Sequence, residues 1–174
     1  MLFFALKLII GLFTLFVALI PLTLSLAFFF GAPFVATPKK IIKEVIELSE
    51  MNGNDFVIDL GSGDGRVLIE SAKICKKAVG FEINPFLVIW TKIIVLLNGR
   101  QTKIEVKFQN YNKSKLSDAS IVFMYSIRKF VPALENNLKR ELRPGTKIIS
   151  YKFPLTLFKQ ITKTKSNIYL YIVK

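Results

Sequence analysis

The sequence contains no histidine and a single cysteine, Cys75, in 174 residues. The missing imidazole excludes histidine-dependent nucleophilic catalysis, histidine general bases and histidine metal ligands. One thiol forms neither an intrachain disulfide nor a cysteine zinc cluster, so a reducing compartment is the simpler assumption. We therefore expect no metal site, and a function that depends on binding and positioning a ligand.

Acidic side chains are scarce in the second half of the chain. The formal net charge is +13, and residues 100–174 hold 16 Lys+Arg against 4 Asp+Glu, whereas residues 1–99 hold 9 against 8. Such a positive field attracts phosphate groups, either of nucleic acid or of an anionic lipid surface. We favour lipid, because the apolar N-terminal segment makes lipid the nearest anion.

Charge is almost absent from the first 30 residues, where Lys7 stands alone. Leu8–Phe30 runs 23 residues without a charge, roughly 35 Å of helix at about 1.5 Å per residue, against a hydrocarbon core of about 30 Å. We expect a single-pass membrane anchor here, with the basic residues of 39–43 holding the remaining chain on the cytoplasmic side. A cleaved signal peptide and a re-entrant hairpin around Pro21 are the alternatives.

After this segment, strand-like and helix-like stretches alternate, which predicts βαβ units around a mostly parallel sheet. We expect an anchor over residues 1–30, a pre-core segment and helix over 31–50, and one α/β domain over 51–174. The expected strands cover 56–58, 78–81, 104–108, 121–125 and 147–151, and the expected helices cover 38–49, 67–76, 85–97 and 132–142. Residues 161–165 and 168–173 have no room for a crossover helix between them, so they predict an antiparallel hairpin at the sheet edge.

The chemistry concentrates in Asp59-Leu60-Gly61-Ser62-Gly63-Asp64-Gly65-Arg66, which follows an apolar strand. Glycines at 61, 63 and 65 allow a sharp turn and a close approach to a ligand, and the next helix presents free amides. A dinucleotide fingerprint needs its third glycine where Arg66 stands. The carboxylate of Asp59 would repel a pyrophosphate and attract an ammonium group, so a ligand with an amino-acid end fits better.

Glu82 ends the next strand, 23 residues after Asp59, where a carboxylate accepts hydrogen bonds from ribose hydroxyls. S-adenosylmethionine carries both an amino-acid end and a ribose, so we predict it as the cofactor. Asn84 is expected to cap the following helix and to lie at the adenine edge.

These residues resemble a family. Asp59–Arg66 with Gly80–Pro85 looks like the first two motifs of class I S-adenosylmethionine-dependent methyltransferases. The match is closer to the membrane-anchored protein lysine methyltransferases that modify the ATP synthase c-subunit and the adenine nucleotide translocase, and it rests on residues 32–38, 57–66, 80–88, 134–142 and 151–154. The resemblance implies a Rossmann-like class I methyltransferase fold, preceded by a transmembrane helix and ending in the antiparallel hairpin.

The resemblance also implies roles for individual residues. It places Asn110 where the family usually has an acidic residue near the adenine, and an amide there still hydrogen-bonds the adenine amino group. It makes Pro33–Thr37 a segment that closes over the site. The expected cofactor-binding residues are Asp59, Gly61, Ser62, Gly63, Asp64, Gly65, Glu82, Asn84 and Asn110.

Three functions remain open. The first is a lysine methyltransferase acting on a protein in or at the membrane, in which a neutral amine attacks the sulfonium methyl group and Thr37, Tyr125 and Ser126 steer the amine. The second is an RNA methyltransferase, suggested by the basic C-terminal half. The third is a non-catalytic cofactor-binding membrane protein. Residues 125–128 lack the Asn-Pro-Pro-Tyr signature of amino-group methylation on nucleobases or glutamine, so the sequence gives no support to that reaction.

Overall fold

The computed structural model describes residues 2–30 and 34–174. The chain forms two compact units, Met1–Phe34 and Val35–Lys174. The first unit contains helix α1 (Leu2–Phe30), which includes Pro21.

The expected membrane anchor is wrong. Over residues 2–30 and 34–174, none of the helices combines the length and the apolar character that a membrane crossing requires. A crossing needs about 20 consecutive, predominantly apolar residues within one helix. The prediction counted uncharged residues along the sequence alone, so the transmembrane helix and the cytoplasmic placement derived from it are both withdrawn.

The second unit is built on a seven-stranded sheet with the order β3-β2-β1-β4-β5-β7-β6. Strands β1 to β5 pair in parallel, and β7 pairs antiparallel with both β5 and β6. The strands are β1 (Phe56–Leu60), β2 (Lys77–Glu82), β3 (Ile104–Phe108), β4 (Ile121–Met124), β5 (Lys147–Tyr151), β6 (Gln160–Lys163) and β7 (Ile168–Ile172). The predicted parallel sheet and its terminal antiparallel hairpin are confirmed.

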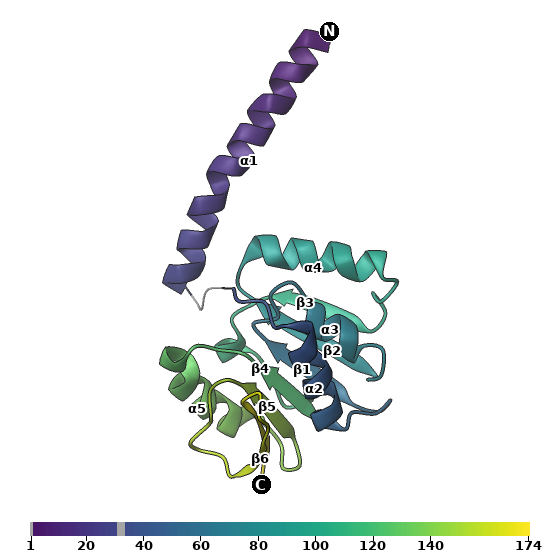
Figure 1. Ribbon diagram of the computed structural model, residues 1–174, viewed down its shortest axis with the longest axis vertical. Helices are drawn as coiled ribbons and strands as arrows, with labels where there is room; N and C mark the ends of the chain where they lie inside the picture. The colour runs from purple at the N-terminus through teal and green to yellow at the C-terminus, as the bar shows by residue number, and fades with distance from the viewer. Residues whose placement is uncertain (1, 31–33) are drawn as a thin grey trace. The chain divides into compact units, whose positions relative to one another are not determined.

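Helices cover both faces of this sheet (Figure 1). They are α2 (Lys39–Ser49), α3 (Arg66–Ser71), α4 (Pro85–Leu97) and α5 (Val131–Glu141), with short 3-10 turns η1 (Tyr111–Lys113) and η2 (Arg128–Phe130). Apolar residues of α2, α3 and α4 pack with one face of the sheet, and those of α5 pack with the other. Burial on both faces explains why the central strands are continuous apolar runs rather than alternating ones.

Most boundaries differ from the expected ones by one or two residues, and the end of α3 differs by five. Helix α3 ends at Ser71 rather than near residue 76, and turns in which the amides of Ile74 and Cys75 donate to the Ser71 carbonyl (3.0 and 2.9 Å) lead into β2. Helix α2 begins at Lys39 rather than at residue 38. Pro38 holds the capping position, and its carbonyl accepts the first hydrogen bond of the helix.

Candidate active site

The glycine-rich loop leaves β1 and folds back against the end of β2. The amides of Gly61 and Ser62 donate to the Phe81 carbonyl at 2.9 and 3.0 Å. Gly61 has a φ of 84°, in the left-handed region that favours glycine, and a Cβ built there would meet no atom within 4 Å. The loop therefore has open space beside Gly61, where a ligand can approach its backbone.

Glu82 binds this loop to the end of β2. Its carboxylate accepts hydrogen bonds from the amides of Gly63 (2.9 Å), Ile83 (2.8 Å) and Asn84 (2.8 Å), and the residue is 8% exposed. A carboxylate has about four acceptor positions, so roughly one remains for a ligand hydroxyl. These backbone amides thus orient the Glu82 carboxylate before any ligand binds.

Asp59 is the unusual group of the site. It is 2% exposed, and its carboxylate accepts no hydrogen bond from any residue in 34–174. Burial, together with the neighbouring charges of Glu82 and Asp64, raises the pKa of Asp59 to about 8. A buried carboxylate without a compensating partner is unfavourable by itself and favourable next to a cation. Asp59 therefore fits the ammonium of an amino-acid ligand.

Close packing holds the loop behind this carboxylate. A Cβ on Gly80 would lie 2.5 Å from Ser62 Oγ and 2.6 Å from Leu68 Cδ1, so only glycine fits there. The Ser62 hydroxyl is buried and finds no hydrogen-bond partner in the described part of the chain. Ser62 thus packs against the backbone of β2.

Helix α4 anchors the second half of the loop through Thr91. Its hydroxyl donates to the Gly63 carbonyl at 2.9 Å, and its methyl group would lie 2.2 Å from a Cβ on Gly65. Thr91 is completely buried. This contact fixes the backbone of the loop on the side away from β1.

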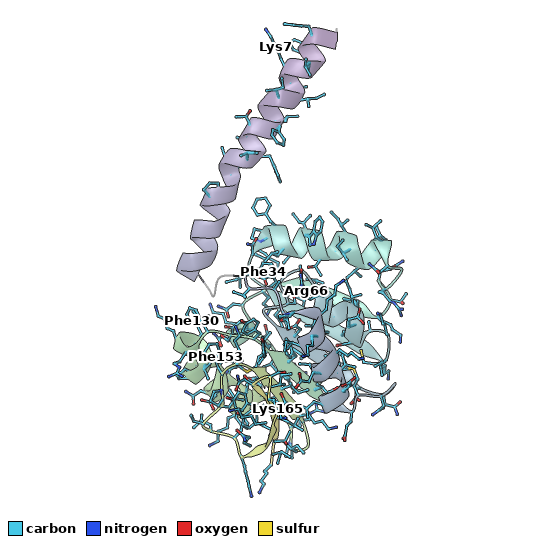
Figure 2. All side chains as sticks on the ribbon, in the orientation of Figure 1. Lys7, Phe34, Arg66, Phe130, Phe153 and Lys165 are labelled. Carbon is cyan, nitrogen blue, oxygen red and sulfur yellow. The ribbon has the colours of Figure 1, made fainter. Side chains whose placement is uncertain are left out.

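Arg66 joins the loop to the segment before α2 and is labelled in Figure 2. Its guanidinium pairs with Asp64 (Nη2 to Oδ2, 2.5 Å) and donates to the Thr37 carbonyl at 3.0 Å. The hydrogen bond that Arg66 donates to the Asp64 carboxylate raises the pKa of Arg66. Arg66 therefore forms an ion pair with Asp64 and a hydrogen bond with the Thr37 carbonyl at the same time.

The neighbouring strand ends carry hydroxyl groups. Tyr125 and Ser126 follow β4, one strand from the glycine loop, since Leu60 of β1 pairs with Met124 of β4. The Ser126 hydroxyl is buried, with no hydrogen-bond partner among the residues that the structure describes. Burial raises the pKa of Tyr111, and the nearby Ser126 hydroxyl opposes that rise. A buried unpaired hydroxyl beside the carboxyl edge of the sheet is suited to contact a ligand.

Known proteins share this arrangement. Residues 59–162 match the model of the ANTKMT methyltransferase domain. A protein-lysine N-methyltransferase of Saccharolobus islandicus is 31% identical over 150 residues, which cover 81% of this chain and 93% of that protein. The chain belongs to this methyltransferase family.

Two further proteins are similar to this chain. The human lysine N-methyltransferase of the ATP synthase c-subunit is 32% identical over 122 residues, which cover 70% of this chain and 52% of that protein, so this chain spans about half of its length. The crystal structure of an RNA methyltransferase from Salinibacter ruber with S-adenosyl-L-homocysteine superimposes with a TM-score of 0.74, at 27% identity, covering 80% of this chain and 94% of that one. S-adenosylmethionine is therefore the cofactor of this methyltransferase, and its class I Rossmann-like α/β fold is confirmed.

The site fits this cofactor at three points. Asp59 offers a buried acceptor to its ammonium, the open backbone at Gly61 admits it, and Glu82 keeps one acceptor position. The assignment of individual residues to individual cofactor groups stays a prediction.

The remaining expected residues have visible structural roles. Asn84 caps α4, accepting from the amides of Phe86 (3.0 Å) and Leu87 (3.4 Å). Asn110 is exposed at the end of β3 and caps η1, accepting from the amide of Asn112 at 2.9 Å. Its side-chain nitrogen donates to nothing in the described chain, which leaves that nitrogen free for a ligand acceptor.

Sequence reasoning missed two residues that this methyltransferase uses to build its loop. Thr91 and Lys92 are the polar residues at the centre of an otherwise apolar α4, and the buried one of the two, Thr91, was a usable signal. Arg66 was noted only as the residue that breaks the dinucleotide fingerprint, and its bond to Thr37 joins positions 29 residues apart.

Proposed function

We propose that the protein transfers a methyl group from S-adenosylmethionine to the side-chain amine of a lysine in another protein. The supporting observation is the similarity to the Saccharolobus islandicus protein-lysine N-methyltransferase, which extends over nearly all of that protein. As a narrower proposal, the acceptor protein lies in or at a membrane, because the human relative is named for the c-subunit of the ATP synthase. We further propose residues 51–174 as the methyltransferase domain and 31–50 as the segment before it.

The residues proposed to bind the cofactor lie at the carboxyl ends of the neighbouring strands β1 and β2. Asp59 binds the cofactor ammonium, Glu82 binds a ribose hydroxyl, and the bound cofactor supplies an electrophilic methyl group. A lysine has a reference pKa of about 10.4, so its ammonium must lose a proton before the amine can attack. In-line attack then needs alignment and exclusion of water more than a strong base.

Tyr125, Ser126 and Thr37 are the proposed groups that steer the amine. The burial of Ser126 directly after β4, whose last residue pairs with Leu60 before the glycine loop, supports its role. Thr37 is 6% exposed and tied to Arg66 through its carbonyl. Pro33, the first residue of the proposed closing segment, lies outside the described residues, while Val35 is exposed.

Methyl transfer with a labelled cofactor tests the function. The full chain is incubated with methyl-tritiated S-adenosylmethionine and a membrane protein fraction, with Asp59→Ala as the inactive control. We expect label in protein, and mass spectrometry should locate it as N-methyllysine. Label confined to another residue type, or no label above the Asp59→Ala control, would overturn the proposal.

RNA is the second candidate acceptor, favoured by the Salinibacter ruber structure and by the basic C-terminal half. The same labelled reaction with total RNA separates the two. Label in RNA, with a gel shift that weakens as salt rises, would establish the second candidate.

A further inference from the structure

Two tyrosines lie at the carboxyl ends of the neighbouring strands β4 and β5. Tyr151 is the last residue of β5, and Tyr125 directly follows β4, whose last residue Met124 pairs with Ser150. Their ring centroids lie 4.7 Å apart, with the planes inclined by 57°. Tyr151 is buried and Tyr125 is half-buried, so the pair presents partly desolvated ring faces at this edge.

An exposed lysine of the same chain lies near both rings. The Lys152 ammonium lies 5.5 Å from the Tyr125 ring centroid and 5.6 Å from that of Tyr151. Both distances are within the roughly 6 Å range of cation–π attraction. Lys152 forms no salt bridge with a carboxylate in 34–174, and the Tyr125 hydroxyl raises the pKa of Lys152.

The backbone holds Lys152 in this place. Its φ is 70°, which is uncommon for a residue with a side chain. Its amide donates to the Asn167 carbonyl at 2.8 Å, and Ser150 Oγ donates to the Phe153 carbonyl at 2.5 Å on the other side. Phe153, labelled in Figure 2, begins the loop that follows. Contacts on both sides thus fix the backbone of Lys152, from which its side chain reaches the rings.

Buried groups hold the loop further along. The Tyr171 hydroxyl accepts from the amide of Leu155 at 2.8 Å. The carboxylate of Glu135, which is 2% exposed, accepts from the amides of Thr156 and Leu157. A loop held at this many points presents its first residue in a defined position.

We propose that Tyr125 and Tyr151 form the binding site for the ammonium group of the acceptor lysine, and that Lys152 occupies this site until an acceptor displaces it. The inference rests on the proposed function, because it identifies the acceptor as a lysine side chain. Ring faces attract an ammonium and discriminate against a neutral group of the same size. An internal lysine lowers the apparent affinity for an external one, because that affinity is the intrinsic affinity multiplied by the fraction of time the site is free.

Binding of n-butylammonium, which has the length of a lysine side chain, tests the site without any methyl transfer. The full chain is labelled with ring-¹³C tyrosine, and the Tyr125 and Tyr151 signals are followed during titration. If Lys152 fills the site about nine-tenths of the time, Lys152→Met should tighten binding about tenfold. Tyr151→Phe should keep binding in the Lys152→Met background, and Tyr151→Leu should abolish it.

Lys163→Met is the matched control. The Lys163 ammonium lies 5.4 Å from the ring of Tyr169, which packs in the hydrophobic core on the other face of the sheet. This variant should titrate as the wild type does, and thermal unfolding should show that every variant is folded. If Tyr151→Leu does not fold, the affinities of Lys152→Met and the wild type for n-butylammonium test the inference by themselves.

Three results would overturn the inference: equal affinity of the wild type and Lys152→Met, no movement of the two tyrosine signals, or equal binding of neutral n-butanol. Binding of n-butylammonium as predicted, without methyllysine in the labelled reaction, would remove the proposed function and leave the cation site. Methyllysine formation without n-butylammonium binding would remove the inference and leave the function.

Discussion

Replacing Asp59 with asparagine should stabilise the cofactor-free protein while it destroys cofactor binding. Asp59 is 2% exposed, and burial beside Glu82 and Asp64 raises its pKa to about 8. An amide of nearly the same shape carries no charge and needs no compensating cation. The buried Asp59 thus lowers the stability of the folded protein and, in return, can bind an ammonium group.

The magnitude follows from proton linkage. The unfolded aspartate has a pKa of about 3.9, so the folded protein binds the extra proton between about pH 4 and pH 8. Stability therefore falls as the pH rises through this window. At about 1.4 kcal/mol per pH unit, Asp59 should lower the free energy of unfolding by about 3–4 kcal/mol between pH 5 and pH 8.

Urea unfolding of the wild type and Asp59→Asn at pH 5 and pH 8, without cofactor, measures this difference. The variant should lack that part of the pH dependence and be the more stable protein at pH 8. Asp118→Asn is the control, because Asp118 is exposed at the surface near Arg143. Parallel pH profiles for the wild type and Asp59→Asn would refute the account of Asp59 as an uncompensated buried acid.

Two further substitutions test the packing behind the loop. Gly80→Ala should lower the free energy of unfolding by about 1–3 kcal/mol, because its Cβ would lie 2.5 Å from Ser62 Oγ. Gly53→Ala is the control in the same urea titration. A Cβ on Gly53 would have only one atom within 4 Å, at 3.9 Å, so this substitution should change the free energy of unfolding far less. Thr91→Val should cost about 1–3 kcal/mol by leaving the Gly63 carbonyl unpaired, and calorimetry should show weaker S-adenosylmethionine binding; unchanged affinity would contradict its role in fixing the loop.

Local patterns predicted the sheet and its acidic residues well. The strands are short apolar runs ended by Asp59 and Glu82, and parallel strands bring their carboxyl ends to one edge, so both acids had to lie near the glycine loop. The terminal hairpin was predictable for the same kind of reason, since two strands separated by a few residues can pair only as antiparallel neighbours.

Contacts between distant positions escaped prediction. Nothing local indicates that Arg66 binds the Thr37 carbonyl, or that Lys152 lies over Tyr125, because these contacts exist only after the strands are ordered in the sheet. The membrane anchor was predicted from the length of the uncharged run alone, and the helices of the described residues do not bear it out.

Titration calorimetry of S-adenosylmethionine with the full chain, Asp59→Ala and Glu82→Ala is the most direct test of the site. Each substitution removes a charged acceptor from a partly buried ligand, a loss of about 1.5–3 kcal/mol, or about 10- to 150-fold in affinity. The account predicts that loss for both variants. Unchanged affinity in both, or a preference of the wild type for a nicotinamide dinucleotide, would contradict it.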